Sequence, residues 1–194
     1  MVHSRGENLR EKPELEENSS PQFDEITLKV PTAVIMAGGK GSRLSPMKPV
    51  LKVCGRPMIQ WIIDVAEKFS ERVIVATVRG HPAEEELSLL SKEIIYTSGK
   101  GYEEDVVEAL RQVKLPALVL SCDLPFIPRE AFETLLRRCR SSICSLYTGS
   151  GFVGMSLWNS LNLNDYETIH FHKDIINVNT IDELEKANKL CSNL

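Results

Sequence analysis

Four short apolar runs alternate with amphipathic stretches between residues 32 and 140, and this alternation constrains the fold more than any other feature. The runs have strand length and are continuously apolar or β-branched: 32–37, 72–78, 93–97 and 117–122. Continuous runs of this kind are typical of strands buried on both faces of a sheet. The stretches that follow them have helix-like spacing of apolar residues: 57–69, 82–91, 102–114 and 129–140.

The repeated strand-helix order predicts an α/β domain. Right-handed crossovers place the strands in a Rossmann-like, mostly parallel sheet with helices on both faces. After residue 141 the pattern is shorter and mixed, and it predicts strands at 142–147, 152–158 and 174–178. A last helix is expected from "TIDELEKANKL", where Thr180 and Glu183 can form a capping box.

The N-terminal segment differs from the rest of the chain in composition. The 194 residues, 42% of them hydrophobic, are enough for one substantial core. Residues 1–30 are instead rich in Glu, Ser, Asn and Lys, and they bury too little apolar surface to offset the entropy of ordering. We therefore expect a flexible tail over 1–30 and a single domain over 31–194. A partner-binding arm and an upstream start codon are the alternatives for the tail.

Charge and cysteine content narrow the function classes. The formal net charge of -4 argues against a protein that grips nucleic acid through a broad cationic face. The five cysteines form no C-x-x-C pair, and their odd number favours reduced thiols in a cytoplasmic protein over a disulfide framework. No apolar run approaches the ~20 residues needed for a membrane span.

The stretch "AGGKGSRL" follows the first apolar run directly, so it is expected in the turn that leaves the carboxyl end of a strand. Glycines in such a turn let backbone N–H groups approach an anion. Lys40 and Arg43 add full charges, and the planar fork of arginine suits phosphate oxygens. The spacing matches neither a P-loop nor G-x-G-x-x-G, yet the combination fits a polyphosphate.

Two polar elements are expected near the same edge. In "LVLSCDLPFIP" an apolar strand ends at Asp123, a position where a carboxylate can bind a hard divalent cation such as Mg²⁺. In "IINVNTIDEL" Asn177 and Asn179 precede the last helix. The simpler alternatives are that Asp123 only forms a turn and that the two asparagines only organise the helix entry.

Together, "MAGGKGSRL", "MKPVLKVCGRPMIQW", "CDLPF" and "NVNTIDEL" resemble the signature motifs of the MobA-like nucleotidyltransferase superfamily. The resemblance implies that a loop wraps the triphosphate of a nucleotide whose α-phosphorus is attacked. It assigns catalytic roles to Arg43, Lys48 and Asp123. It also implies Mg²⁺ held by Asp123 and Asn179, with Asn177 as the neighbouring possibility. The residues that it places on the nucleotide phosphates are Ala37, Gly38, Gly39, Lys40, Gly41, Arg43 and Lys48.

A further stretch, "TSGKGYEED", resembles the archaeal GTP:adenosylcobinamide-phosphate guanylyltransferases of cobalamin biosynthesis (CobY type). In relatives this loop reads the base, which here implicates Thr97, Ser98, Gly99, Lys100 and Gly101. The implied reaction moves GMP from GTP to adenosylcobinamide phosphate and releases pyrophosphate. An acceptor phosphate is already ionised at neutral pH, so no general base is required. Between Asp123 and Asn177 only "GFVGMSL" resembles the family, in its acceptor half.

Three other hypotheses remain open. Molybdopterin guanylyltransferases and sugar-phosphate nucleotidylyltransferases use the same donor half. A nucleotide-binding regulator without catalysis is the third, and the presence of Arg43, Lys48 and Asp123 disfavours it. The expected partners are GTP and the corrinoid acceptor, with no nucleic acid. The oligomeric state is open and includes a homodimer.

Overall fold

The computed structural model describes residues 28–39 and 44–193. The tail expected over residues 1–30 falls almost wholly outside this part of the chain. So do Lys40, Gly41 and Arg43 of the glycine-rich stretch.

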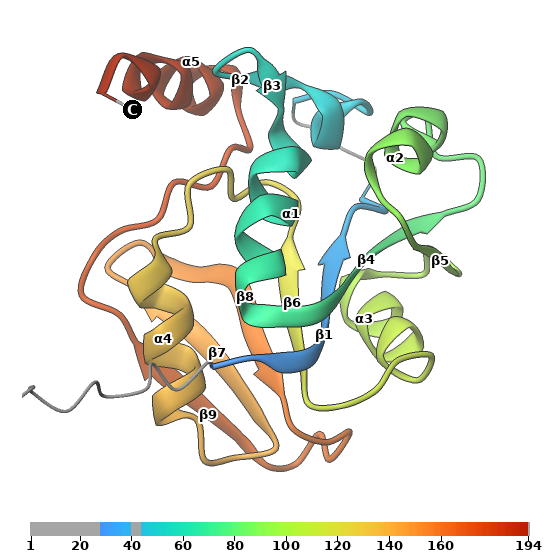
Figure 1. Cartoon of the computed structure of the whole chain (residues 1–194), viewed down its shortest axis with the longest axis vertical. Coiled ribbons are helices and arrows are strands. Elements are labelled where there is room, and N and C mark those ends of the chain that lie inside the picture. The colour runs from blue at the N-terminus through green and yellow to red at the C-terminus, as the bar shows by residue number, and fades with distance from the viewer. Residues whose placement is uncertain (1–27, 40–43, 194) are drawn as a thin grey trace, which may run out of the picture.

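A twisted sheet of seven strands forms the centre of the described chain (Figure 1). Its spatial order is β5-β4-β1-β6-β8-β7-β9. The strands are β1 (Val30–Met36), β4 (Ser70–Val78), β5 (Ile94–Thr97), β6 (Ala117–Ser121), β7 (Ile143–Thr148), β8 (Gly151–Trp158) and β9 (Tyr166–His170). All neighbouring pairs are parallel except those that involve β8, which runs antiparallel to β6 and β7. The expected α/β fold with a mostly parallel sheet is therefore confirmed.

Five α-helices surround the sheet in the described residues, and two short strands form a hairpin beside it. The helices are α1 (Met58–Phe69), α2 (Glu84–Leu90), α3 (Tyr102–Leu110), α4 (Arg129–Arg138) and α5 (Ile181–Lys189). The hairpin consists of β2 (Lys52–Val53) and β3 (Arg56–Pro57), preceded by the 3₁₀ turn η1 (Lys48–Val50); a second 3₁₀ turn, η2 (Leu190–Asn193), follows α5.

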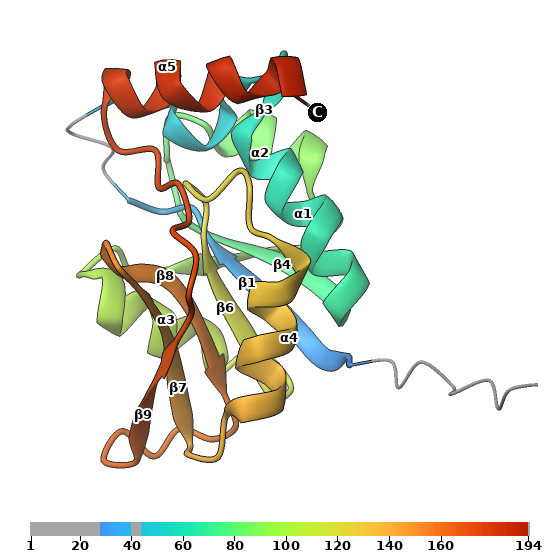
Figure 2. The same cartoon turned by 90° about the vertical axis from the view of Figure 1, so that its left-hand side faces the viewer.

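Alternate residues of β1 divide the core into two layers. Ala33 and Ile35 belong to the larger cluster, which α1, α2 and α4 cover. Val34 and Met36 point to the opposite face and pack with residues of α3. The two helical layers lie on opposite sides of the sheet (Figure 2). Helix α4 packs on β7, β8 and β9, whereas α3 packs mainly on β1 and β5.

The four early strands lie where the apolar runs predict them, but the prediction fails after residue 160. Residues 174–178 form no strand; instead the backbone N–H of Val178 donates to the carbonyl of Asp123 (2.9 Å), so this segment crosses the end of β6. Ile175 and Val178 are buried without joining a ladder, which explains their strand-like composition. The actual edge strand is β9, in which only Ile169 is buried.

The expectation of five reduced cysteines is wrong in this structure. Cys54 pairs with Cys191, with Cα atoms 5.4 Å apart, and Cys139 pairs with Cys144 at 5.7 Å. Cys122 is free and buried. The spacing of cysteines in the sequence could not reveal these pairs. One pair joins positions separated by 137 residues, and the other depends on how the chain passes from α4 to β7.

Helix α5 lies over the β2–β3 hairpin at one end of the molecule (Figure 1). Val53, Met58 and Ala187 form a small apolar cluster between them, and Asn188 accepts a hydrogen bond from the backbone of Cys54 at 2.9 Å. The capping box of Thr180 and Glu183 at the start of α5 is confirmed. This helix therefore fixes the segment before it, which contains the asparagines of interest.

Gly154 determines how closely β8 approaches β6. Its φ is +75°, and a Cβ atom there would lie 2.8 Å from the Cβ of Ser121. Gly151 also has a positive φ, +111°, but open space around the position of its missing Cβ.

We expect Gly154→Ala to lower the free energy of unfolding by about 2–4 kcal/mol, because backbone strain and overpacking add. The matched control is Gly80→Ala, because Gly80 has a φ of +72° and open space around the position of its missing Cβ. It adds only the backbone strain and should cost about 1–2 kcal/mol. Urea denaturation monitored by circular dichroism would measure both; equal losses would show that the contact with Ser121 does not matter.

Candidate active site

A cavity of about 470 Å³ opens at the carboxyl ends of β1, β5 and β6. It gathers segments that are far apart in the sequence: the turn after β1, the loop before α3, the end of β6 and the segment before α5. The residues that line it are Met36, Gly38, Gly39, Leu44, Lys48, Pro49, Gly99, Lys100, Gly101, Tyr102, Asp105, Ser121, Cys122, Asp123 and Asn179. Most of the described residues that the sequence predicted for a nucleotide site therefore share one cavity.

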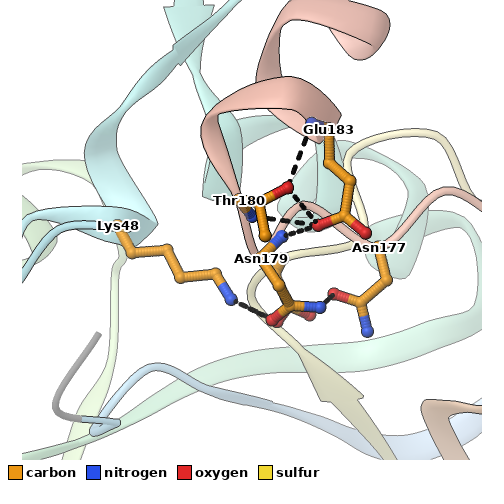
Figure 3. Close-up of polar contacts among 6 residues, drawn as sticks. Lys48, Asn177, Asn179, Thr180 and Glu183 are labelled. Atoms are coloured by element: carbon orange, nitrogen blue, oxygen red, sulfur yellow. Dashed lines mark hydrogen bonds and ion pairs between the residues drawn. The ribbon is translucent and has the colours of Figure 1, made fainter. Parts of the chain in front are cut away.

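Lys48 connects the two polar elements of this cavity. Its Nζ donates to Oδ2 of Asp123 at 2.6 Å. It also donates to Oδ1 of Asn179 at 2.8 Å (Figure 3). Both charged side chains are largely buried, with exposed fractions of 14% for Lys48 and 10% for Asp123. Since an unpaired buried charge is costly, each charge makes the burial of the other tolerable.

The second oxygen of Asp123 lacks a partner. Among the described residues, Oδ1 of Asp123 is the buried side-chain oxygen or nitrogen that makes no hydrogen bond. A buried carboxylate oxygen left without a partner costs free energy, of order 1–3 kcal/mol. Such an atom at the wall of a cavity is suited to a ligand that supplies positive charge or a donor.

Asn177 and Glu183 hold Asn179 in its orientation. Nδ2 of Asn179 donates to Oδ1 of Asn177 at 2.7 Å, which directs its own carbonyl oxygen to Lys48 (Figure 3). The carboxylate of Glu183 accepts from the backbone N–H groups of Asn179 (2.7 Å) and Thr180 (2.9 Å). The hydrogen bond from the backbone of Asn179 is the main reason that the pKa of Glu183 lies below its usual value. Asn177 thus contacts Asn179 rather than the cavity.

The donor set fits a divalent cation that takes few protein ligands. The described residues contain no cluster of three or more His, Cys, Asp or Glu side chains placed to hold a metal. Asp123 and Asn179 offer one carboxylate and one amide oxygen, and Lys48 lies between them. Mg²⁺ commonly binds through one or two carboxylates, waters and substrate phosphates, so the free Oδ1 of Asp123 is compatible with it.

The turn after β1 is tied to β4 and α2. A Cβ atom on Gly38 would lie 3.3 Å from Val78, so the close approach of β4 favours glycine there. The carbonyl of Gly39 lies 3.2 Å from Nε2 of His81, a residue that the sequence gave no reason to select. Ala37 is fully buried and does not line the cavity.

The loop between β5 and α3 contributes only its later residues to the cavity. Gly99, with φ +71°, donates its N–H to Asp105 at 2.8 Å, and a Cβ atom there would lie 3.0 Å from Val78. Thr97 is buried, and its hydroxyl donates to a β4 carbonyl. The N–H and hydroxyl of Ser98 both donate to Glu108 at 2.7 Å. Thr97 and Ser98 thus brace the loop, while Gly99, Lys100 and Gly101 face the cavity.

Tyr102 and Cys122 are among the cavity residues that the sequence analysis did not select. Tyr102 begins α3 and is 53% exposed overall, but desolvation of its hydroxyl end raises its pKa to about 12, with the nearby charge of Asp123 adding to the effect. Burial likewise raises the pKa of Cys122 to about 12, so this thiol stays protonated. A tyrosine at a helix start carries no sequence signal for a site; only the fold brings it beside Asp123.

Comparison with known proteins assigns the chain to a family. The family model described as MobA-like NTP transferase domain matches residues 33–175. The chain belongs to the MobA-like NTP transferase family. The match covers the turn after β1, the end of β6 and most of the mixed half of the sheet.

Curated relatives match over part of the chain. The adenosylcobinamide-phosphate guanylyltransferase of Methanocaldococcus jannaschii is 38% identical over 100 residues, which are 47% of this chain and 51% of that protein. The bifunctional protein GlmU of Thermoanaerobacter pseudethanolicus is 32% identical over 110 residues, 53% of this chain and 24% of GlmU. The chain therefore spans about half the length of the first relative and about a quarter of the second.

Solved structures confirm the nucleotidyltransferase fold. The molybdopterin-guanine dinucleotide biosynthesis protein A of Archaeoglobus fulgidus superposes with a TM-score of 0.65 at 18% identity, over 84% of this chain and 100% of that one. Rv0371c of Mycobacterium tuberculosis, solved in complex with manganese, superposes with a TM-score of 0.60 at 12% identity, over 84% of this chain and 100% of that one.

None of the helices in the described part of the chain has the length and apolar content that crossing a bilayer requires.

Glu183 should make the segment before α5 sensitive to acid. Because its folded pKa is lowered, its carboxylate contributes stability above the unfolded pKa of about 4.3, and this contribution is lost as the pH falls through the folded value. We expect Glu183→Gln to lower the free energy of unfolding by about 1 kcal/mol at pH 7, and by progressively less below about pH 4. Thermal melts from pH 7 to pH 3 would measure this, with Glu185→Gln on the same helix as control; a difference that is constant with pH would contradict it.

Proposed function

We propose that the protein is a guanylyltransferase that moves GMP from GTP to adenosylcobinamide phosphate and releases pyrophosphate. The observation that carries the nucleotide part of this proposal is the contact of Lys48 with both Asp123 and Asn179 in one cavity beside Gly38 and Gly39. The acceptor part is supported by the 38% identity to the Methanocaldococcus enzyme and by the "TSGKGY" loop. The 32% identity to GlmU makes a sugar phosphate the second candidate acceptor.

In the proposed reaction, the triphosphate lies along the turn after β1, where the backbone amides of Gly38 and Gly39 face it. Lys48 leaves the carboxylate of Asp123 and binds a phosphate oxygen instead. Lys100, in the loop between β5 and α3, contributes a second positive charge. Arg43, Lys40 and Gly41, which lie outside the described residues, are proposed to complete the phosphate contacts. These groups stabilise the charge that develops on the transferring phosphoryl group and on pyrophosphate.

An oxygen of the acceptor phosphate attacks the α-phosphorus of GTP. The new P–O bond forms as the bond to the bridging oxygen of the β-phosphate breaks, and the electron pair leaves with pyrophosphate. The nucleophile carries its own negative charge, so no side chain must remove a proton. The absence of histidine from the lining of the described cavity agrees with this.

We propose that Asp123, with the amide oxygen of Asn179, holds Mg²⁺ when the nucleotide is bound. Bound by these two residues, the ion would supply positive charge for the phosphate oxygens and for the departing pyrophosphate. When Lys48 binds a phosphate instead, Oδ2 of Asp123 and Oδ1 of Asn179 would become free to bind the cation.

The test is a matrix of substrates. Each of the four common nucleoside triphosphates is incubated with adenosylcobinamide phosphate, molybdopterin or a hexosamine 1-phosphate, and pyrophosphate release is followed. Release that requires both GTP and the corrinoid is the expected result. Release with UTP and the sugar phosphate would replace the proposal by its second candidate. Nucleotide binding without release with any acceptor would indicate a non-catalytic regulator.

Asp123→Asn should leave a folded protein but lower kcat by a factor of about 100 or more, because the charge at the end of β6 is lost without a change of shape. Steady-state kinetics at saturating GTP and corrinoid phosphate measure the effect, and circular dichroism checks the fold. The exposed Asp165, outside the cavity, supplies the control Asp165→Asn, which should retain full activity. Activity of Asp123→Asn close to wild type would remove the proposed role.

A further inference from the structure

A second cavity, of about 700 Å³, lies along α3 on the face of the sheet opposite α4. Its floor consists of residues from β6, β7 and β8, including Val119, Ser145, Ser156 and Trp158. Tyr166 of β9 also lines the cavity and is 75% exposed. We call this cavity the α3 groove.

The α3 groove borders the cavity that contains Asp123, because Tyr102 lines both. Glu108 lines the groove and accepts hydrogen bonds from Ser98, in the loop between β5 and α3. Trp158 pairs with Ala117, four residues before Ser121, and at about 3.3 Å per residue it lies about 13 Å from the reacting edge of the sheet. A ligand that fills both cavities must therefore extend well beyond its reacting group.

The groove has an aromatic and aliphatic floor and an acidic wall. The α3 wall carries three carboxylates, Glu103, Glu104 and Glu108, and one cation, Arg111. This charge disfavours phosphate and favours a neutral or cationic ring system, while Trp158 and Tyr166 offer faces for stacking. Its volume falls in the range of small-molecule sites. A sugar phosphate is too short to reach Trp158 from Asp123.

We propose that the α3 groove binds the body of the acceptor, a large flat ring system with net positive or no charge, while the acceptor's phosphate reaches Asp123. This rests on the proposed function and deepens it. A corrin ring carrying cobalt(III) and an adenosyl ligand has this chemistry, since its net charge is positive. The concave shape of the groove favours this occupant over a second copy of the chain, which would need a broad, flatter face.

Adenosylcobinamide without its phosphate is the probe that separates this inference from the reaction. Corrinoids absorb where tryptophan emits, and the chain has two tryptophans, Trp61 and Trp158. Saturable quenching that Trp61→Phe retains and Trp158→Phe loses is the expected result. If Trp158 is quenched but the phosphorylated acceptor is not turned over, the proposed function is wrong and the groove assignment stands. No quenching in the wild type would overturn the groove assignment.

Two variants test the groove in turnover. Ser145→Phe fills its floor and should raise the KM for the corrinoid phosphate about tenfold, with the KM for GTP unchanged. Glu104→Lys reverses a charge on an exposed part of the wall, where folding is not at risk, and should raise the same KM about two- to fivefold. An unchanged KM for the corrinoid phosphate in both variants would overturn the assignment.

A separate observation concerns His81, which is 6% exposed. Its Nδ1 accepts from the backbone N–H of Ala83 at 3.1 Å, and its Nε2 lies 3.2 Å from the carbonyl oxygen of Gly39. A backbone N–H can only donate, so Nδ1 carries no proton, and Nε2 must be the donor to Gly39. We infer that His81 is a positioning residue, which fixes the carbonyl of Gly39 and with it the course of the turn that presents Gly38 and Gly39 to the cavity.

Two substitutions separate the two nitrogens of His81. Glutamine keeps a donor near the position of Nε2, whereas asparagine keeps an acceptor near that of Nδ1. His81→Gln should bind GTP within about twofold of wild type with a lowered melting temperature, and His81→Asn should bind GTP about tenfold more weakly with a smaller melting change. Isothermal titration with GTP in the absence of acceptor measures this. Equal weakening, or none, in both variants would show that His81 acts only on stability.

Discussion

The ion pair between Lys48 and Asp123 is the contact on which the site depends. The Asp123 side chain, just beyond the end of β6, is only 10% exposed, and without a cation its charge would be strongly destabilising. Lys48 lies in η1, Asp123 in the turn that follows β6 and Asn179 in the segment before α5. One ammonium group therefore connects three distant parts of the chain. The helix α5 and its capping box then hold Asn179 in place, and the hairpin beneath α5 returns to the region of Lys48.

This arrangement leaves the pair poised for exchange. The second oxygen of Asp123 has no partner among the described residues, and the ammonium group can satisfy phosphate as well as carboxylate. The structure therefore places a fixed cation, a free carboxylate oxygen and an oriented amide around a cavity that is bounded by glycine turns. Such a set suits phosphoryl chemistry, in which positioning and charge matter more than proton transfer.

The two halves of the sheet differ in how they are covered. Both faces of β1 and its neighbours carry helices, which accounts for their continuous apolar sequence. Strands β7 to β9 have α4 on one face, and on the other they line the α3 groove with small and aromatic side chains. The half of the sheet that contains β1, β4 and β6 is therefore covered on both faces, while the other half leaves one face accessible along the α3 groove.

The sequence alone determined the parts whose signal is local. Apolar runs predicted β1, β4, β5 and β6, the capping box predicted the start of α5, and the position of Asp123 after an apolar run predicted a carboxylate at the edge of the sheet. Only the tertiary structure decided the course of residues 174–178, the strand β9, the cysteine pairs and the contacts of Tyr102 and His81. The physical reason is that these features depend on contacts between segments far apart in the chain, and neither composition nor spacing records which distant residues meet.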